Sequence, residues 1–268
     1  MKHNYILPTL ALGAVIIAGQ PVLCATLASS EPTPTKQYQN APSQEEQVYQ
    51  QAEAERVAGK YDAAIADYNR VLQMNPKNAF ALGSRGAAKL MKGDAQGAIE
   101  DLTASLNIND KDAFTWTFRG LAYVATNQPQ AAISDATKAI GLDPKMELAY
   151  FIKGRSEYAT KDYTAAIDDL KEAINLHPEY ARNWFYAACS LQCMNKMDDA
   201  KVAWQKCVEL APNNPDAHYN LAIVLRTLGD KQNAIAELQV AAKQYQELNQ
   251  QQYAQDALAM IQQLQQAA

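Results

Sequence analysis

The side chains best suited to metal or redox chemistry are two cysteines four residues apart, Cys189 and Cys193. If their segment is helical, this spacing places both thiols on one face, where they could form a redox pair or hold a metal ion. No histidine or carboxylate in the segment completes a ligand set. Cys207 stands where neighbouring segments carry alanine, which favours a small buried residue. We therefore expect no metal and no cofactor, while a role for the cysteine pair stays open.

The histidines and carboxylates form no catalytic arrangement. His177 precedes a proline and is expected at a solvated helix end, and His218 stands where other segments carry Trp or Tyr and is expected to pack. The acidic pairs Asp168–Asp169 and Asp198–Asp199 are expected at helix starts, where negative charge complements the helix dipole. The sequence has no serine-nucleophile elbow, zinc-protease motif or glycine-rich phosphate loop. It predicts no catalytic residue and no enzyme.

The segments that would carry these side chains repeat along the chain. The segment that begins at Ala165, AAIDDLKEAINLHPEYA, closely resembles the segment that begins at Ala131, AAISDATKAIGLDPKME. One alanine recurs in every copy at intervals of 34 residues, as Ala64, Ala98, Ala132, Ala166, Ala200 and Ala234. A fixed period of this size indicates a stack of similar units rather than one closed core.

One repeat, Glu147 to Tyr180, shows what each unit is. Apolar and small residues recur at steps of three and four, with one break around Lys161, which describes two helices joined by a turn. Pro178 then ends the second helix. Gly154 and Ala166 are small because the two helices must approach each other closely at these positions.

This repeat resembles the tetratricopeptide repeat family, whose 34-residue pattern is W-x2-L-G-x2-Y, then A-x3-F, then P. The third repeat matches the pattern at Trp116, Gly120, Tyr123, Ala132 and Pro144. It departs from the pattern at position 7, with Arg119 for Leu, and at position 24, with Ala136 for Phe. The resemblance implies an all-α fold, a right-handed superhelical solenoid of antiparallel helix pairs with about six repeats over residues 45–248.

Residues 249–268 are expected to form a capping helix. They are rich in Gln but carry one apolar stripe, made by Ala254, Ala257, Leu258, Ile261 and Leu264. A solenoid needs such a terminal element with a polar outer side.

The N-terminus is a separate segment. Lys2, an apolar run over residues 5–19 and the small residues that follow predict a signal peptide over residues 1–28. Residues 29–44 are rich in Pro, Ser, Thr and Gln and are expected to be a flexible linker. Cleavage would leave a periplasmic or secreted protein. The alternatives are an uncleaved membrane anchor, for which the apolar run is short, and a lipid on Cys24, which Leu23 disfavours because a small residue is needed there.

The charge balance narrows the class of partner. The chain has 24 basic and 29 acidic residues and no basic patch, so it lacks the cationic surface that binds nucleic acid. In the tetratricopeptide family the first helix of each repeat lines a concave face that binds protein or peptide segments. Aromatic and arginine side chains at those positions would be exposed unless a partner or a neighbouring helix covers them. The candidate groove residues are Phe80, Phe114, Leu121, Leu148, Phe151, Arg155, Tyr158, Arg182, Phe185, Tyr219 and Arg226.

The expected function is therefore an exported interaction scaffold, which binds an extended or helical segment of a partner during assembly of an envelope or secretion complex. The alternative is a membrane- or lipid-anchored assembly factor. Membrane contact is expected only if the N-terminal segment is retained.

Overall fold

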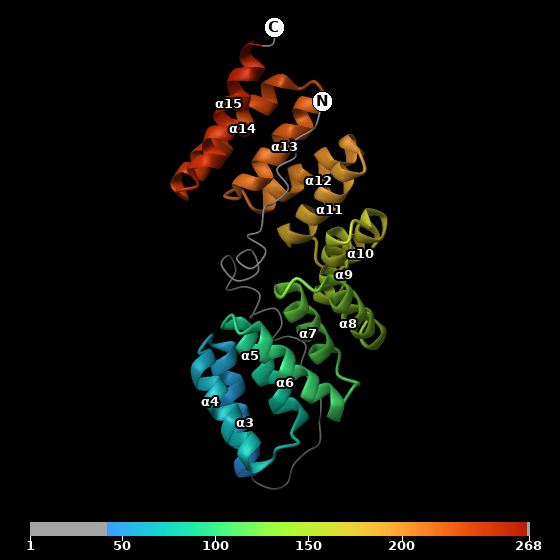
Figure 1. The fold of residues 1–268 in the computed structure, drawn as a ribbon, viewed down its shortest axis with the longest axis vertical. Helices are drawn as coiled ribbons and strands as arrows, with labels where there is room; N and C mark the ends of the chain where they lie inside the picture. The colour runs from blue at the N-terminus through green and yellow to red at the C-terminus, as the bar shows by residue number, and fades with distance from the viewer. Residues whose placement is uncertain (1–41, 267–268) are drawn as a thin grey trace. The chain divides into compact units, whose positions relative to one another are not determined.

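The computed structural model describes residues 42–266, which form thirteen α-helices and no strand (Figure 1). The first helices of the six pairs are α3 (Gln44–Val57), α5 (Ala79–Met91), α7 (Ala113–Ala125), α9 (Glu147–Ala159), α11 (Ala181–Cys193) and α13 (Pro215–Thr227). The second helices are α4 (Tyr61–Met74), α6 (Ala95–Ile108), α8 (Pro129–Leu142), α10 (Tyr163–Leu176), α12 (Met197–Leu210) and α14 (Lys231–Glu247). The last helix is α15 (Gln251–Gln266). The predicted signal peptide and residues 29–41 of the predicted linker lie outside the described residues.

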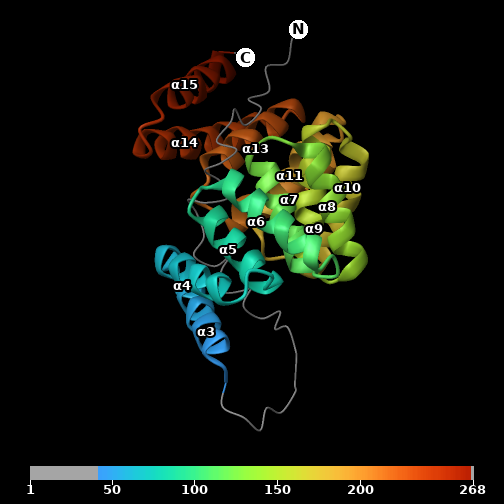
Figure 2. The ribbon, with the colours of Figure 1, turned by 60° about the horizontal axis from the view of Figure 1, so that its bottom comes forward.

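Consecutive helices pack against each other from α3 to α8 in the N-terminal part and from α10 to α15 in the C-terminal part, which confirms the predicted all-α fold of helix pairs. Within each pair the two helices are joined by a short turn, and the C-terminal helix α15 packs on α14. Figure 2 shows α13, α14 and α15 as neighbours in the C-terminal part. None of the helices in residues 42–266 is both long and apolar enough to cross a membrane.

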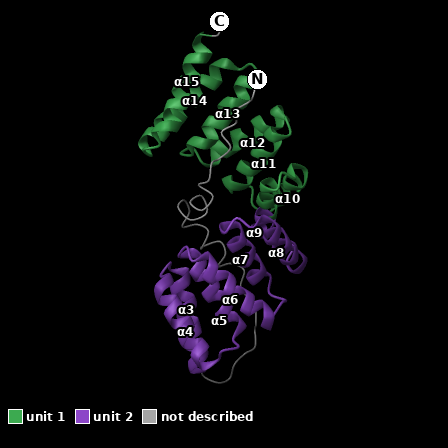
Figure 3. Ribbon diagram, in the orientation of Figure 1, with its two compact units in different colours: residues 1–9, 153–268 green, residues 10–152 purple. Residues whose placement is uncertain are grey.

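The described residues divide into two compact units, drawn in different colours in Figure 3, and the division falls inside α9 between Ile152 and Lys153. One unit, here the N-terminal unit, holds α3 to α8 and the start of α9. The other, the C-terminal unit, holds the rest of α9 and α10 to α15.

The turn inside each pair is built on one backbone conformation. A residue with positive φ recurs there at intervals of 34, as Gly59, Gly93, Asn127, Lys161, Asn195 and Gly229. This left-handed residue ends the first helix, and the next amide then bonds back to a helix carbonyl, as Asp162 N does to Glu157 O at 2.9 Å. Glycine and asparagine adopt this conformation most readily, which explains five of the six residues.

The core runs between the helices of each pair. All six alanines of the 34-residue ladder are fully buried. The residues at position 24 of each repeat, which lie one turn further along the same second helix, are also fully buried, as Tyr68, Leu102, Ala136, Leu170, Trp204 and Leu238. A Cβ added to Gly154 would lie 2.7 Å from Leu170 Cγ and 3.0 Å from the Ala166 carbonyl oxygen. The predicted close approach of Gly154 and Ala166 is therefore correct.

Half-buried ion pairs link the two helices in repeats 2, 3 and 4, each between residues 16 apart. They join Arg85 to Asp101, Arg119 to Asp135 and Lys153 to Asp169, with shortest N–O distances of 2.6, 2.7 and 2.6 Å. In repeats 2 and 3 the guanidinium also donates to the preceding second helix, at Asn69 Oδ1 (2.7 Å) or Thr103 Oγ1 (3.2 Å).

These pairs correct one expectation from the sequence. Asp168 and Asp169 lie well inside α10 rather than at its start, because Asp162 caps that helix by accepting from Ala165 N. Asp169 instead forms the ion pair with Lys153. Asp198 and Asp199 do lie in the first turn of α12, as predicted.

Candidate binding face of the first helices

In the N-terminal unit the first helices α3, α5 and α7 contact one another, so their free faces form one surface. Phe80, near the start of α5, is the most exposed aromatic residue on it, with 58% of its area open to solvent. Phe114 holds the same repeat position on α7 and is half-buried, with its ring 4.3 Å from that of Phe118. The guanidinium of Arg56, on α3, lies 5.9 Å from the centre of the Phe114 ring. We call Arg56, Phe80 and Phe114 the aromatic patch.

Arg56 is held in place by a buried network on α3 and α4. Its Nη2 lies 2.7 Å from Glu53 Oε2, and the Tyr68 hydroxyl donates to the other oxygen of Glu53. Burial alone would raise the pKa of Glu53, but the hydrogen bond and charge of Arg56 outweigh burial and lower it. Burial and the nearby Glu53 charge raise the pKa of Tyr68 far above its usual value. At neutral pH the network therefore holds an ionised Glu53 and a cationic Arg56.

In the C-terminal unit most candidate side chains contact one another. Tyr158 packs edge-on against Tyr186 at 5.8 Å, and the guanidinium of Arg155 lies 5.6 Å from the same ring. Phe185 meets the buried Trp204 at 4.9 Å with nearly perpendicular rings. These rings stabilise the packing of α9, α11 and α12 residues within the unit.

The structure thus places the eleven predicted residues in three surroundings. Five are buried, namely Leu121, Leu148, Phe151, Arg155 and Tyr219. Four are half-buried, namely Phe114, Tyr158, Arg182 and Phe185. Phe80 and Arg226 are exposed. At the five buried positions neighbouring side chains cover the predicted groove residues, which is the alternative left open by the sequence, and a partner would have to displace these neighbours to reach them. Binding itself remains a prediction.

His218 takes over a structural role that tryptophan plays in other repeats. Trp116 and Trp184 each donate from Nε1 to the carbonyl six residues earlier, at 2.7 and 2.8 Å, and His218 Nε2 lies 2.9 Å from the Pro212 carbonyl. His218 Nδ1 lies 2.6 Å from Glu237 Oε2. Because a carbonyl can only accept, Nε2 carries a proton, and Nδ1 can donate to the carboxylate only in an imidazolium.

The pKa of His218 agrees with this geometry. Burial would lower it, but the hydrogen bonds to Glu237 and Pro212 outweigh burial and raise it. The prediction that His218 packs is confirmed. His177 lies at the end of α10, half-buried, stacked on Tyr180 and 2.9 Å from Glu179.

The three described cysteines differ in their exposure to solvent. Cys189 is buried, while Cys193, the last residue of α11, is exposed. Burial raises the pKa of Cys189 well above its ordinary value and that of Cys207 to about 12, so both stay thiols. The predicted burial of Cys207 is confirmed. Within residues 42–266, no three His, Cys, Asp or Glu side chains are grouped as metal ligands would be.

Sequence reasoning missed Arg56 and Glu53 as parts of the face. Arg56 shares a repeat position with Tyr158 and Arg226, which were predicted, since 34-residue steps connect the three. That shared position was the available signal. What it could not reveal is the contact of α3 with a residue on α7, two helix pairs further on.

Comparisons with known proteins agree with this architecture. A tetratricopeptide repeat profile matches residues 49–113 and 119–181, and a second one matches residues 203–236. No curated protein matches the sequence. The crystal structure of MamA superposes with a TM-score of 0.56 at 25% identity, over 62% of this chain and 96% of that one.

Two further solved structures share the fold. PilW, described as a type IV pilus biogenesis factor, has a TM-score of 0.69 at 19% identity, over 81% of this chain and 100% of that one. YrrB, described as a TPR protein with an unusual peptide-binding site, has a TM-score of 0.60 at 16% identity, over 72% and 97%. From the repeat ladder, the helix pairs and the matched profiles together, this chain belongs to the tetratricopeptide repeat family, whose fold is that of a protein-interaction scaffold.

Proposed function

We propose that this chain holds an extended or helical segment of another polypeptide against the first-helix face of its N-terminal unit, and that it does so outside the cytoplasm during assembly of an envelope or secretion complex. The observation that carries the binding proposal is the solvent exposure of Phe80. A phenylalanine that leaves 58% of its area in water gains free energy when a partner covers it.

The other two residues of the aromatic patch support a polypeptide partner. Phe114 adds apolar surface on the neighbouring first helix α7, and Arg56, whose guanidinium lies over the Phe114 ring, adds a fixed cation with five hydrogen-bond donors, of which Glu53 engages some. Aromatic and arginine side chains are the usual anchors of protein interfaces. Such an arrangement favours a segment with an apolar side chain beside a carbonyl or carboxylate.

The proposal of export rests on the sequence alone. Lys2, the apolar run and the small residues before position 29 support a cleaved signal. Export would be tested by sequencing the N-terminus of the mature protein, which should begin between about Ala25 and Ser29. An exported protein that retains Met1 would instead support the anchored assembly factor.

Binding can be tested with a library of displayed peptides selected on the purified chain. A selected peptide is then titrated against Phe80→Ala and against Val202→Ala, the matched control. Val202 lies on the second helix α12 and is 62% exposed, so both variants remove an exposed apolar side chain. We expect Phe80→Ala to weaken binding roughly tenfold or more, and Val202→Ala to have little effect. Equal affinities for both variants would reject the aromatic patch as the binding site.

A further inference from the structure

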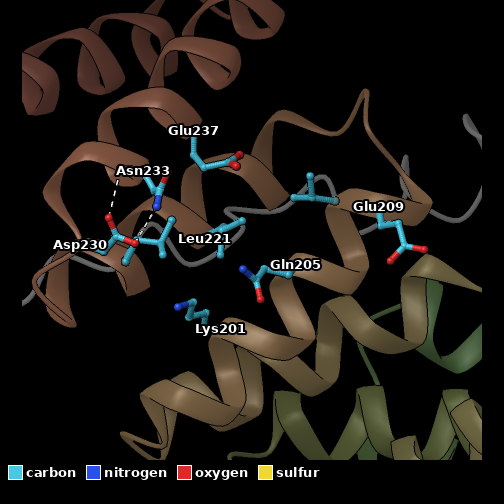
Figure 4. A pocket seen from close by; sticks show the side chains of 9 residues that line it. Lys201, Gln205, Glu209, Leu221, Asp230, Asn233 and Glu237 are labelled. Atoms are coloured by element: carbon cyan, nitrogen blue, oxygen red, sulfur yellow. Dashed lines mark hydrogen bonds between the residues drawn. The ribbon is translucent and has the colours of Figure 1, made fainter.

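A cavity of about 410 Å³ lies in the C-terminal unit, apart from the aromatic patch (Figure 4). Its walls come from α12, α13 and α14. In Figure 4 Glu237 on α14 and Gln205 on α12 stand on opposite sides of the opening, with Leu221 between them. Leu221 and Leu225, both buried, form an apolar floor.

The repeat pattern identifies what fills this place elsewhere in the chain. Steps of 34 residues equate Glu237 with Asp101 and Asp135, and Leu221 with Arg85 and Arg119. In repeats 2 and 3 the arginine occupies the position and donates to the aspartate at 2.6 to 2.9 Å. In repeat 6 the carboxylate is present, but the residue opposite it is Leu221, the residue type of the family pattern, and not arginine.

Two further wall residues follow the same correspondence. Gln205 is equivalent to Asn69, which accepts from Arg85 at 2.7 Å. Leu225 is equivalent to Lys89, the second cation on Asp101, whose Nζ lies 2.8 Å from Oδ2. Repeat 6 therefore has both groups that accept from a guanidinium but lacks both cations of repeat 2.

The fifth repeat shows that the fold does not require an ion pair at this position, because there both partners are alanine, Ala187 and Ala203. Glu237 does have one cationic partner, since His218 binds its Oε2 at 2.6 Å. Asp101 shows that a carboxylate at this position holds two cations at once.

We propose that this cavity binds the guanidinium of an arginine presented by a partner polypeptide. Glu237 and the Gln205 side-chain oxygen accept from it, in the roles of Asp101 and Asn69, and the leucine floor packs against the arginine methylenes. Charge favours this occupant, because three carboxylates, Glu209, Asp230 and Glu237, line the cavity beside one lysine, Lys201. Asp230 already caps α14 by accepting from Asn233 N at 3.2 Å, so Glu237 is the main ligand. The site does not depend on the proposed function of the aromatic patch.

The probe is a tripeptide, Gly-Arg-Gly, acetylated at its N-terminus and amidated at its C-terminus, titrated into the full chain and followed by NMR signals of the α12 to α14 residues. The matched control replaces arginine with citrulline, which has nearly the same shape and no charge. We expect the arginine peptide to bind at least about tenfold more tightly than the citrulline peptide. Equal shifts with the two peptides would overturn the proposal.

Two variants make the test independent of folding. Leu221→Arg supplies the missing arginine from the chain itself, as in repeats 2 and 3, and should abolish binding while the chain stays folded. Lys201→Met removes the competing cation and should tighten binding. Unchanged binding by a folded Leu221→Arg protein would contradict the proposal.

Free arginine distinguishes the source of the ligand. It has the same net charge as the capped tripeptide but lacks the flanking peptide groups, so tighter binding of the free amino acid than of the tripeptide would overturn the assignment to a polypeptide.

Discussion

The guanidinium of Arg119 on α7 forms a two-pronged ion pair with the carboxylate of Asp135 on α8, with Nε 2.7 Å from Oδ2 and Nη2 2.9 Å from Oδ1. The family pattern has leucine at the position of Arg119. This chain therefore uses a polar contact where the family uses an apolar one. Arg85 and Asp101 in the preceding repeat do the same, and Lys153 and Asp169 form a similar single-point pair.

Replacing Arg119 with the family residue should destabilise the protein. Arg119→Leu leaves Asp135, whose side chain is 5% exposed, without its cation. An uncompensated buried charge typically costs ~3 kcal/mol of unfolding free energy. Adding Asp135→Ala should recover most of that loss, as alanine at this position is accepted in repeat 5. Urea unfolding followed by circular dichroism measures both. If the double variant is no more stable than Arg119→Leu alone, the unpaired Asp135 carboxylate is not the cause of the lost stability.

Three equivalent glycines should respond differently to alanine. At Gly154 an added Cβ would lie 2.7 Å from Leu170 Cγ, and Gly86 has the same contact with Leu102, whereas at Gly120 the nearest atoms are 3.5 Å away. Gly154→Ala should therefore cost ~1–3 kcal/mol of stability. Gly120→Ala should be neutral or stabilise by up to ~1 kcal/mol, because alanine favours the helix. Thermal or urea unfolding that ranks Gly120→Ala as the more damaging change would refute this packing.

The His218–Glu237 pair should make stability depend on pH. Since the folded-state pKa of His218 is raised, its contribution is complete below the unfolded pKa of ~6.5 and is lost as pH rises through the folded value. The difference in unfolding free energy between wild type and His218→Gln should shrink between about pH 6 and pH 9. His177→Gln, which removes a more exposed histidine at the end of α10, is the control. A difference that is the same at both pH values would show that His218 is not cationic in the fold.

The cysteines should differ sharply in reactivity. Cys193 is exposed, whereas Cys189 and Cys207 are buried with raised pKa values, so few of their thiols ionise. Brief treatment of the native protein with iodoacetamide should label Cys193 and leave Cys189 and Cys207 unmodified until the protein is unfolded. Peptide mapping by mass spectrometry reads this directly. Rapid labelling of Cys207 would mean that its site beside α11 opens readily.

The sequence predicted the parts of the fold that steric limits determine. Only a small residue fits where Ala166 meets Gly154, so the 34-residue spacing of alanines located both helices and their contact. Leu170 and its equivalents, which fill the space beside these small residues, could be assigned to the core from the same 34-residue spacing.

The sequence could not decide which residues of the first-helix face remain open. Phe80 and Leu148 hold the same repeat position, yet Phe80 is exposed and Leu148 is buried. That difference depends on how closely the neighbouring helices approach, which the sequence of a single repeat does not determine. The ion pairs were missed for a similar reason. Arg119 was noted as a departure from the family, but its partner lies 16 residues away on another helix.

The central claim, that the aromatic patch holds another polypeptide, is tested most directly by photo-crosslinking in the producing cell. The crosslinking residue p-benzoylphenylalanine is placed at Phe80 and, in a second strain, at the equally exposed Val202 on α12. Irradiation should join position 80 to another polypeptide and give much less product from position 202. Phe114→Ala, which alters the patch without touching the probe, should reduce the product from position 80. Equal products from positions 80 and 202, or none from position 80, would contradict the account.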